Sequence, residues 1–541
     1  MNYKTWRKRV YRTTIPRITC VKWLLNRLVS RVRDEERPYI NRLGYLSRIR
    51  SQVTVNPLQP ADLARSKSFI PPAFSAARPT LDKLRVAVLP LQNMSPDPND
   101  EYFADGLTEE LITSLSRVKQ LTVIARTSVM RYKGSEKSAS DVGKELNVGS
   151  LIEGSVRKAG NRVRITATLI DTSTEGHLWV ENYDKNLDDI FAVQSEIAEK
   201  VVDELKTQLL DSEKRTLEKK PTENTEAYTC FLQGRELLRE ENEASVRRAI
   251  VLFEKAIELD SKFARAYVGI AACHQLLGDR GYESADVSVS TVKPLLEHAV
   301  KLDPNLPEAH AALSGMFFNE DDVLRAEAEA RRALELNPSL PDTYHALFEL
   351  AALKGDPDAM VRAIETAYHL DPIRPRFIQL LGMAYVWTGR DQEALEHWKK
   401  TEQLAPLGTY RGMTEYYLAK GNVEKAKEFH ANVEKLEPTR PPTIWMEGVI
   451  AAQEGDREKA LLAIKRIEEA NIGPLGFNYI AYVYCALGDL DSYFEYINRA
   501  LETHAIVTSV LMYSHLFDRA RADARYRELV EKLREQCGLT K

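Results

Sequence analysis

The sequence predicts an α+β protein of several domains, in which a small α/β domain precedes an all-α superhelical solenoid. Residues 83–211 combine short apolar runs, typical of strands, with amphipathic helices. Residues 222–541 contain a helical pattern that recurs every 34 residues, which indicates stacked supersecondary units. A basic arm at residues 1–50 and a proline-rich linker at residues 51–82 precede both parts.

Charge is spread unevenly along the 541 residues, although the net charge is only −4. Residues 1–50 hold fourteen Lys or Arg and three Asp or Glu, which gives +11 and leaves −15 for the rest of the chain. This asymmetry indicates a basic arm ahead of an acidic folded body.

The five cysteines are odd in number and far apart in sequence, which argues against a disulfide framework or a zinc site and fits a reducing compartment. No apolar run reaches the ~18 residues that a membrane helix requires. Polar residues interrupt the N-terminal apolar stretch at residues 21–29, so it does not resemble a secretory signal. We therefore expect no transmembrane segment and a cytoplasmic protein.

Strands and helices alternate in the predicted α/β domain. The apolar runs Leu84–Leu91 and Gln120–Arg126 favour buried strands. Gly149–Thr172 holds two alternating runs that meet at Ala159–Asn161, which predicts a β-hairpin with Val163, Ile165, Ala167 and Leu169 on its apolar face. A helical period is found in Asp105–Val118, Ser138–Val148 and Leu187–Leu210.

An acidic cluster near the first of these helices raises the question of acid–base or metal chemistry. It consists of Glu101, Asp105, Glu109 and Glu110. Asp105 is more simply explained as a helix N-cap, and Glu109 and Glu110 as acids in the first turns, where the helix dipole favours them. Arg126, Arg131, Arg157 and Arg162 could hold an anion but are more typical of a solvated face, and Trp179 beside His177 suggests packing.

No phosphate-binding loop, nucleophile elbow or zinc-protease motif occurs in the chain. We therefore predict no catalytic residues, no cofactor, no metal site and no enzymatic activity.

The repeated pattern ends each time in a leucine, one residue and a proline. The prolines Pro304, Pro338, Pro372 and Pro406 are 34 residues apart. In the last unit Gly382 and Ala394 are small enough for close helix approach, Trp398 fills the space between hairpins, and Gly389 suits a positive φ. Because proline cannot continue a helix, each proline is expected to close one helical hairpin.

This unit resembles the tetratricopeptide repeat, with Leu381-Gly382, Tyr385, Ala394 and Trp398 at the family's positions. About eight hairpins fit between Thr225 and His504, and stacking would give a curved solenoid with a concave groove. The groove is the usual ligand surface of that family, and a solvated helix face without a ligand is the alternative. The resemblance places His345, Glu349, Arg376, Gln379, Met383 and Trp387 in the groove as contacts for a partner protein.

The α/β domain resembles the TolB-like amino-terminal domain, which precedes tetratricopeptide repeats in many bacterial regulators. The resemblance lies in "VAVLPLQNMSPDPNDEYFADGLTEELITSLSR" from Val86 and "LIEGSVRKAGNRVRITATLIDT" from Leu151, and it covers about 130 residues in all. It implies a domain without enzymatic activity, whose ligand the resemblance does not name.

Regulators of this arrangement often begin with a winged-helix DNA-binding domain, and Ile18–Ile49 resembles its end. Val21–Arg33 would be the recognition helix, and Lys22, Arg27, Arg31 and Arg33 would contact DNA. Only seventeen residues precede Ile18, too few for the usual helical core. A truncated domain, a misassigned start and an accidental likeness are therefore all open, as are contact with a membrane or a partner and no direct role.

The leading hypothesis is a bacterial regulatory protein whose repeats bind a protein or ligand and which modulates transcription through the arm. The alternatives are a pure interaction scaffold and an accessory part of a nucleotide-cyclase-type signalling system. Homo-oligomerisation is left open.

Overall fold

The computed structural model describes residues 81–279, 282–438, 440–470, 472–504 and 507–539. The basic arm and nearly all of the linker lie outside the described residues. The predicted DNA contacts Lys22, Arg27, Arg31 and Arg33 lie there too, and so does the predicted recognition helix.

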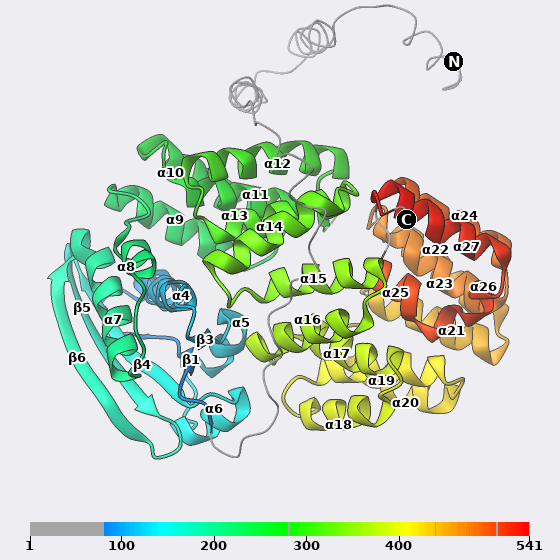
Figure 1. The fold of residues 1–541 in the computed structure, drawn as a ribbon, viewed down its shortest axis with the longest axis horizontal. Coiled ribbons are helices and arrows are strands. Elements are labelled where there is room, and N and C mark those ends of the chain that lie inside the picture. The colour runs from blue at the N-terminus through cyan, green and yellow to red at the C-terminus, as the bar shows by residue number, and fades with distance from the viewer. Residues whose placement is uncertain (1–80, 280–281, 439, 471, 505–506, 540–541) are drawn as a thin grey trace, which may run out of the picture. The chain divides into compact units, whose positions relative to one another are not determined.

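One mixed sheet forms the centre of the α/β segment, residues 81–218 (Figure 1). Its continuous strand order is β3-β1-β4-β5-β6, and the short β2 pairs with β4. β1 is parallel to β3 and β4, whereas β5 is antiparallel to β4 and β6. The strands are β1 (Arg85–Val88), β2 (Gln92–Asn93), β3 (Thr122–Val123), β4 (Ser150–Ala159), β5 (Arg162–Asp171) and β6 (Gly176–Asn186).

The hairpin of β4 and β5 confirms the predicted alternation, since Val163, Ile165, Ala167 and Leu169 are all buried. Gly160 in its turn has a φ of +59°, a conformation that glycine adopts at little cost. The long edge strand β6 was not predicted, because nearly all of its side chains are exposed or half-buried and no apolar alternation marks it. Trp179 lies in β6 and donates from Nε1 to Glu181.

Helices α4 and α7 pack on each other and against the sheet (Figure 1). The helical elements of this segment are η3 (Pro98–Asp100), α4 (Glu101–Ser116), α5 (Arg126–Val129), η4 (Met130–Tyr132), α6 (Ala139–Leu146), η5 (Leu187–Asp189), α7 (Ile190–Glu204) and α8 (Asp211–Glu218).

The predicted N-cap at Asp105 is wrong. α4 begins four residues earlier, at Glu101, because Phe103 and Ala104 are buried and extend the apolar face backwards from Leu107. Asp105 therefore lies in the second turn of the helix. The predicted strand Gln120–Arg126 is also shorter than expected, since the chain turns into α5 at Arg126.

Residues 225–502 fold into consecutive antiparallel helix pairs that follow one another from α9 to α24 (Figure 1). The pairs are α9 (Thr225–Leu238) with α10 (Glu243–Leu259), α11 (Ala264–Asp279) with α12 (Ala285–Leu302), α13 (Pro307–Asn319) with α14 (Val323–Leu336), α15 (Pro341–Lys354) with α16 (Pro357–Leu370), α17 (Pro375–Trp387) with α18 (Asp391–Thr401), α19 (Pro406–Ala419) with α20 (Val423–Leu436), α21 (Pro441–Glu454) with α22 (Arg457–Glu469), and α23 (Leu475–Leu487) with α24 (Leu490–Glu502).

Trp398 is fully buried between two successive pairs. A Cβ atom built on Gly382 of α17 would lie 2.2 Å from the Trp398 ring, and one on Gly412 of α19 would lie 2.5 Å from it. Both glycines therefore make room for the indole. Gly389 has a φ of +76°, as the turn between α17 and α18 requires.

The prolines take two different roles. Pro304, Pro338 and Pro372 each follow the end of a second helix by two residues, as predicted. Pro406 does not close a hairpin, because α18 ends at Thr401 and Pro406 is the first residue of α19. Proline is tolerated there because the first N–H of a helix has no intrahelical acceptor.

The C-terminal segment departs from the paired pattern. It comprises α25 (Thr508–Tyr513), η6 (His515–Phe517), α26 (Asp518–Arg521) and α27 (Ala524–Gln536). Phe517 is fully buried against Tyr482 and Tyr493 of the last pair, with ring centroids 4.9 Å and 5.9 Å away. From this anchor η6 contacts α19 and α23, while α25 contacts α15.

Candidate functional site

Helices α15, α17, α19 and α23 are all first helices of their pairs, and all four contact the C-terminal segment. We call the surface that these four helices present to the C-terminal segment the inner wall. α15 and α17 supply the six residues predicted for the groove. Among them Met383, Gln379 and Trp387 are buried, Glu349 is nearly so, His345 is half-buried and Arg376 is exposed.

Arg376 is the electrostatic centre of this wall. Burial lowers the pKa of His345 to about 3, and the charges of Arg376 and Arg374 lower it further, so the imidazole is neutral near pH 7. Burial raises the pKa of Glu349 and of Glu415, and Arg376 opposes both shifts. Within the described residues Arg376 forms no salt bridge, so its cation is available to an acidic group.

Polar contacts along the wall are few and specific. Gln379 donates from Nε2 to Oε2 of Glu415 at 3.0 Å, which joins α17 to α19. His345 Nε2 lies 4.0 Å from Glu349 Oε1, and it has no hydrogen-bond partner among the described residues. Nε1 of Trp387 is likewise buried without an acceptor there. The wall therefore holds unused hydrogen-bonding capacity next to a free cation.

The chain's own C-terminal segment occupies part of this wall. Glu349 accepts hydrogen bonds from the backbone N–H of Ser509 at 2.9 Å and from its hydroxyl at 3.0 Å. Trp387 stacks between Phe348 and Tyr513, with both ring centroids 6.5 Å away. Two of the six predicted residues thus contact α25, a contact that no period in the sequence indicated.

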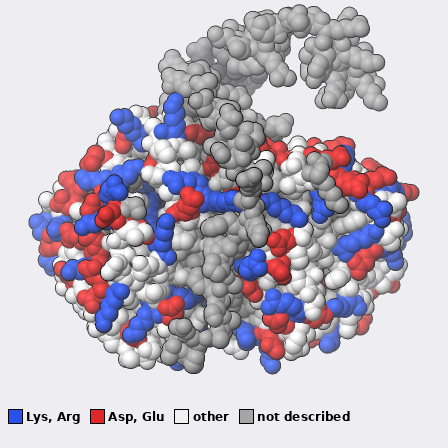
Figure 2. Space-filling view, viewed as in Figure 1, with Lys and Arg blue, Asp and Glu red and all other residues white. Residues whose placement is uncertain are grey.

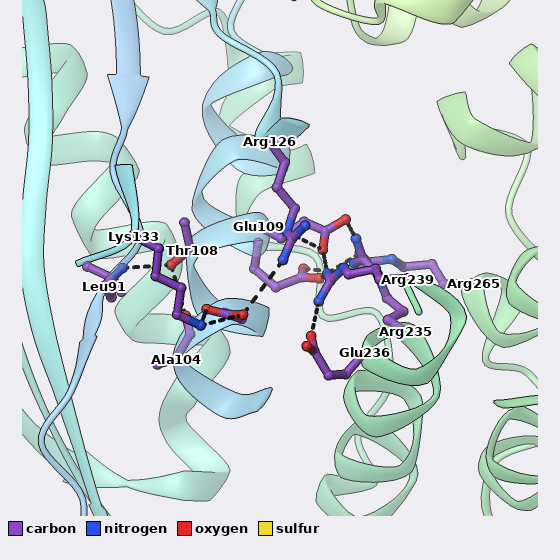
Figure 3. A network of polar contacts seen from close by, with 12 residues as sticks. Leu91, Ala104, Thr108, Glu109, Arg126, Lys133, Arg235, Glu236, Arg239 and Arg265 are labelled. Atoms are coloured by element: carbon purple, nitrogen blue, oxygen red, sulfur yellow. Dashed lines mark hydrogen bonds and ion pairs between the residues drawn. The ribbon is translucent and has the colours of Figure 1, made fainter. Parts of the chain in front are cut away.

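A second cluster joins α4 to the first two helix pairs (Figure 3). Its acids are Glu101, Asp105, Glu109, Glu110 and Glu236, and its bases are Arg126, Lys133, Arg235, Arg239 and Arg265. Lys133 holds Asp105 at 2.8 Å and Glu101 at 2.7 Å. Glu109 pairs with Arg235 of α9 and with Arg239, the residue that directly follows α9, and Arg126 Nε lies 3.4 Å from its Oε2.

Glu110 is a deeply buried acid of the α4–α9 contact. Arg265 of α11 binds it through two nitrogens, at 2.6 Å and 2.7 Å, and Arg235 adds a third contact at 3.2 Å. Burial opposes the charge of Arg265, but the pairing with Glu110 outweighs it and raises the arginine pKa. The expectation that Glu109 and Glu110 lie in the first turns is wrong, because they lie in the third turn and pair across the junction.

Loops between helix pairs cover the free edge of β3. Ala125 N–H donates to the carbonyl of Leu370 at 2.8 Å, and Val123 N–H donates to Ser339 Oγ at 3.2 Å. Ser128 Oγ donates at 2.6 Å to Oδ1 of Asp371, which is fully buried and whose Oδ2 lacks a partner among the described residues. The α/β segment is therefore fixed to the repeats through both α4 and its sheet edge.

Two clefts flank these contacts. One of about 350 Å³ lies between α4–α5 and the helices α9 and α11, lined by Arg126, Arg265 and Phe231. A larger one, about 820 Å³, lies beside the α8–α9 connection, where basic and acidic side chains mix. The arginines of the first cleft are already paired with acids.

The other side chains that could bind a metal or form a disulfide do not form a site within the described residues. The structure brings no three His, Cys, Asp or Glu side chains together as a metal site within the residues it describes. Cys230, Cys273, Cys485 and Cys537 are buried free thiols. Over the described part of the chain, no helix combines the length and apolar character needed to cross a membrane.

No protein-family model matches the chain. Over 260 residues it is 37% identical to a Rhizobium meliloti (strain 1021) protein named "Putative adenylate cyclase 3", a match that covers 47% of this chain and 43% of that protein. Over 195 residues it is 22% identical to "Cellulose synthase operon protein C" of Pseudomonas fluorescens (strain SBW25), which covers 33% of this chain and 15% of that protein. The matches thus span less than half the length of these curated relatives.

Solved structures of other proteins are similar to parts of this chain. PilF of Pseudomonas aeruginosa matches 40% of this chain and 95% of its own, at 18% identity and a TM-score of 0.30. Human IFIT1, as a dimer with m7Gppp-AAAA, matches 58% and 77%, at 17% identity and a TM-score of 0.38. YrrB, described as a TPR protein with an unusual peptide-binding site, matches 33% and 92%, at 19% identity and a TM-score of 0.23.

Proposed function

We propose that this chain is a non-enzymatic interaction protein whose tetratricopeptide-type repeats bind a segment of a partner protein on the inner wall. The proposal rests on what the inner wall binds and on which of its polar groups lack partners. It already holds a peptide segment, α25, and it keeps an unpaired Arg376 and an orphan N–H on Trp387 beside it. The TolB-like α/β segment braces the first repeats and supplies no chemistry in this proposal.

Site-specific photo-crosslinking tests this function. A photoreactive residue at Arg376 should crosslink one discrete partner in the cells that make the protein, whereas the same residue at the exposed Lys400 of α18 should not. Both positions are exposed, so accessibility alone cannot explain a difference. Equal crosslinking at both positions, or none at either, would count against partner binding on the inner wall.

A role as an accessory part of a nucleotide-cyclase system is the second candidate. The observation in its favour is the 37% identity over 260 residues to the protein named "Putative adenylate cyclase 3". In this proposal the matched region regulates and does not catalyse. The purified chain should then form no cyclic AMP from ATP with Mg²⁺ or Mn²⁺, and activity that co-purifies through successive columns would contradict it.

Transcription control is the finer proposal, and it depends on the basic arm. On the face drawn in Figure 2, basic and acidic side chains of the described residues are interspersed. If six arm residues neutralise phosphates, log K for duplex DNA should fall with log salt at a slope of about −5. Fluorescence anisotropy should show this slope, and it should disappear when residues 1–50 are deleted.

A further inference from the structure

The occupant of the inner wall shows which chemistry the wall accepts. In α25, Ser509 and Tyr513 are four residues apart and so lie on one face of the helix. Ser509 binds Glu349 of α15, and Tyr513 stacks on Trp387 of α17. Thr508, Ser509 and Leu511 are each at most 2% exposed, so the segment is seated in the wall.

The fit of α25 to the wall is incomplete. Trp387 Nε1 and His345 Nε2 have no hydrogen-bond partner within the described residues, and a buried donor without an acceptor costs about 1–3 kcal/mol. The segment Thr508–Tyr513 carries no acid, so it forms no ion pair with Arg376. Another segment of similar shape could satisfy groups that α25 leaves unsatisfied.

The segment is also held at its far end by contacts that involve neither α15 nor α17. Phe517 is fully buried in the last helix pair, and Tyr526 Oη donates to the carbonyl of Leu511 at 2.7 Å. Through this anchor α25 is presented to the wall at a high effective concentration, which for short links is in the millimolar range. Any competing segment binds with an apparent affinity reduced by the fraction of chains whose wall is free.

We propose that α25 is a built-in competitor for the inner wall, which a partner protein displaces with a segment of matching and stronger chemistry. That segment carries a hydroxyl residue, an aromatic residue four positions later, and an acid before the hydroxyl. The hydroxyl replaces Ser509 at Glu349, and the aromatic replaces Tyr513 at Trp387. The acid pairs with the exposed Arg376, which forms no salt bridge within the described residues. This inference rests on the proposed function.

Peptide binding to the full-length chain tests the competition. The probes are fluorescein-labelled VTSVLMYS, the sequence of residues 507–514, and DVTSVLMYS, which adds the acid. Tyr513→Ala weakens the resident segment without altering the wall, so both probes should bind this variant at least about tenfold more tightly than the wild type. Adding Trp387→Leu should remove the gain. Arg376→Gln, in the Tyr513→Ala background, should remove only the advantage of the acidic probe.

Equal affinity for wild type and Tyr513→Ala would overturn the proposal, and so would a gain that survives Trp387→Leu. A shift to a dimer in light scattering of Tyr513→Ala, with no gain in peptide affinity, would also overturn it, because a second copy would then fill the wall. Should Tyr513→Ala not fold, Ser509→Ala carries the same expectation. In wild type, excess DVTSVLMYS should speed hydrogen exchange in residues 508–513, and unchanged exchange at saturation would refute displacement.

The test separates this proposal from the one it rests on. If photo-crosslinking at Arg376 finds a partner but Tyr513→Ala does not strengthen peptide binding, the function stands and the competition fails. If peptides compete with α25 but no partner crosslinks in cells, α25 is only an intramolecular contact of the wall and the proposed function fails.

Discussion

Two junctions in this molecule hold helices together by opposite means. Between α17 and α19 the contact is apolar: Trp398 is fully buried, and Gly382 and Gly412 leave the space that its ring fills. Between α4 and α9–α11 the contact is ionic, and Glu110 is enclosed by Arg235 and Arg265.

The two junctions contribute differently to the stability of the fold. Burying an indole stabilises the folded state directly, because apolar surface leaves water. Burying ion pairs gains little net free energy, since desolvation offsets the attraction, but removing one partner is costly. Apolar packing therefore stabilises the contacts between repeats, whereas the ionic junction determines the orientation in which the α/β segment packs against them.

The apolar junction should give the largest effect. Trp398→Ala removes a fully buried ring and leaves a cavity between two glycines, so it should destabilise α17–α19 by about 3–5 kcal/mol. Hydrogen exchange of the α17 and α19 amides measures this loss. Lys399→Ala, at the adjacent exposed position, is the control and should leave exchange unchanged. A loss below about 0.5 kcal/mol for Trp398→Ala would mean that the ring does not hold the junction.

The ionic junction should give the next effect. Glu110→Gln keeps the side-chain shape but leaves Arg265 buried without its main counter-ion. We expect a loss of about 2–3 kcal/mol, because a buried unpaired charge is costly but Arg265 also lies over the ring of Phe231. Faster exchange in α4 and α11, with α17–α19 unaffected, is the expected pattern.

The matched control is Glu258→Gln, which removes the same charge at an exposed position of α10. If both variants behave alike, the Glu110 cluster contributes no more than a surface pair. If Glu110→Gln also speeds exchange in α17–α19, the two junctions are coupled and do not stabilise the fold independently.

Local sequence patterns predicted those parts of the fold that depend on residues close to one another in the chain. The hairpin of β4 and β5, the small residue Gly382 against Trp398 and the positive φ of Gly389 all follow from spacing and residue size. Pro406 misled the prediction, because the same residue can follow one helix or begin the next.

Contacts between distant segments were not predictable in this way. Arg265 is 155 residues from Glu110, and Ser509 is 160 residues from Glu349, so no periodic pattern links either pair. The six inner-wall residues were placed by their resemblance to a repeat, but their occupant was missed, because α25 is short and lies beyond the last repeated unit. β6 was missed since exposure on both faces leaves no alternation.

The smallest effect should come from Asp371, which lies where a repeat loop meets α5. Its carboxyl is fully buried and accepts from Ser128, and burial raises its pKa, although Ser128 and Arg374 oppose the shift. The folded state therefore binds this proton more tightly than the unfolded state. Asp371 should contribute most to stability below its unfolded pKa, near 3.9, and less as pH rises through the raised folded pKa.

Asp371→Asn should abolish this contribution to the pH dependence while keeping an acceptor for Ser128. Relative to wild type, the variant should gain stability as pH rises from about 4 to 7, by less than either junction mutation costs. Hydrogen exchange of α5 and α17 at several pH values, corrected for intrinsic rates, measures the difference. A wild-type advantage that grows with pH would mean that the carboxylate is stabilised at this junction, and the loop contact would then belong with the ionic junction of α4.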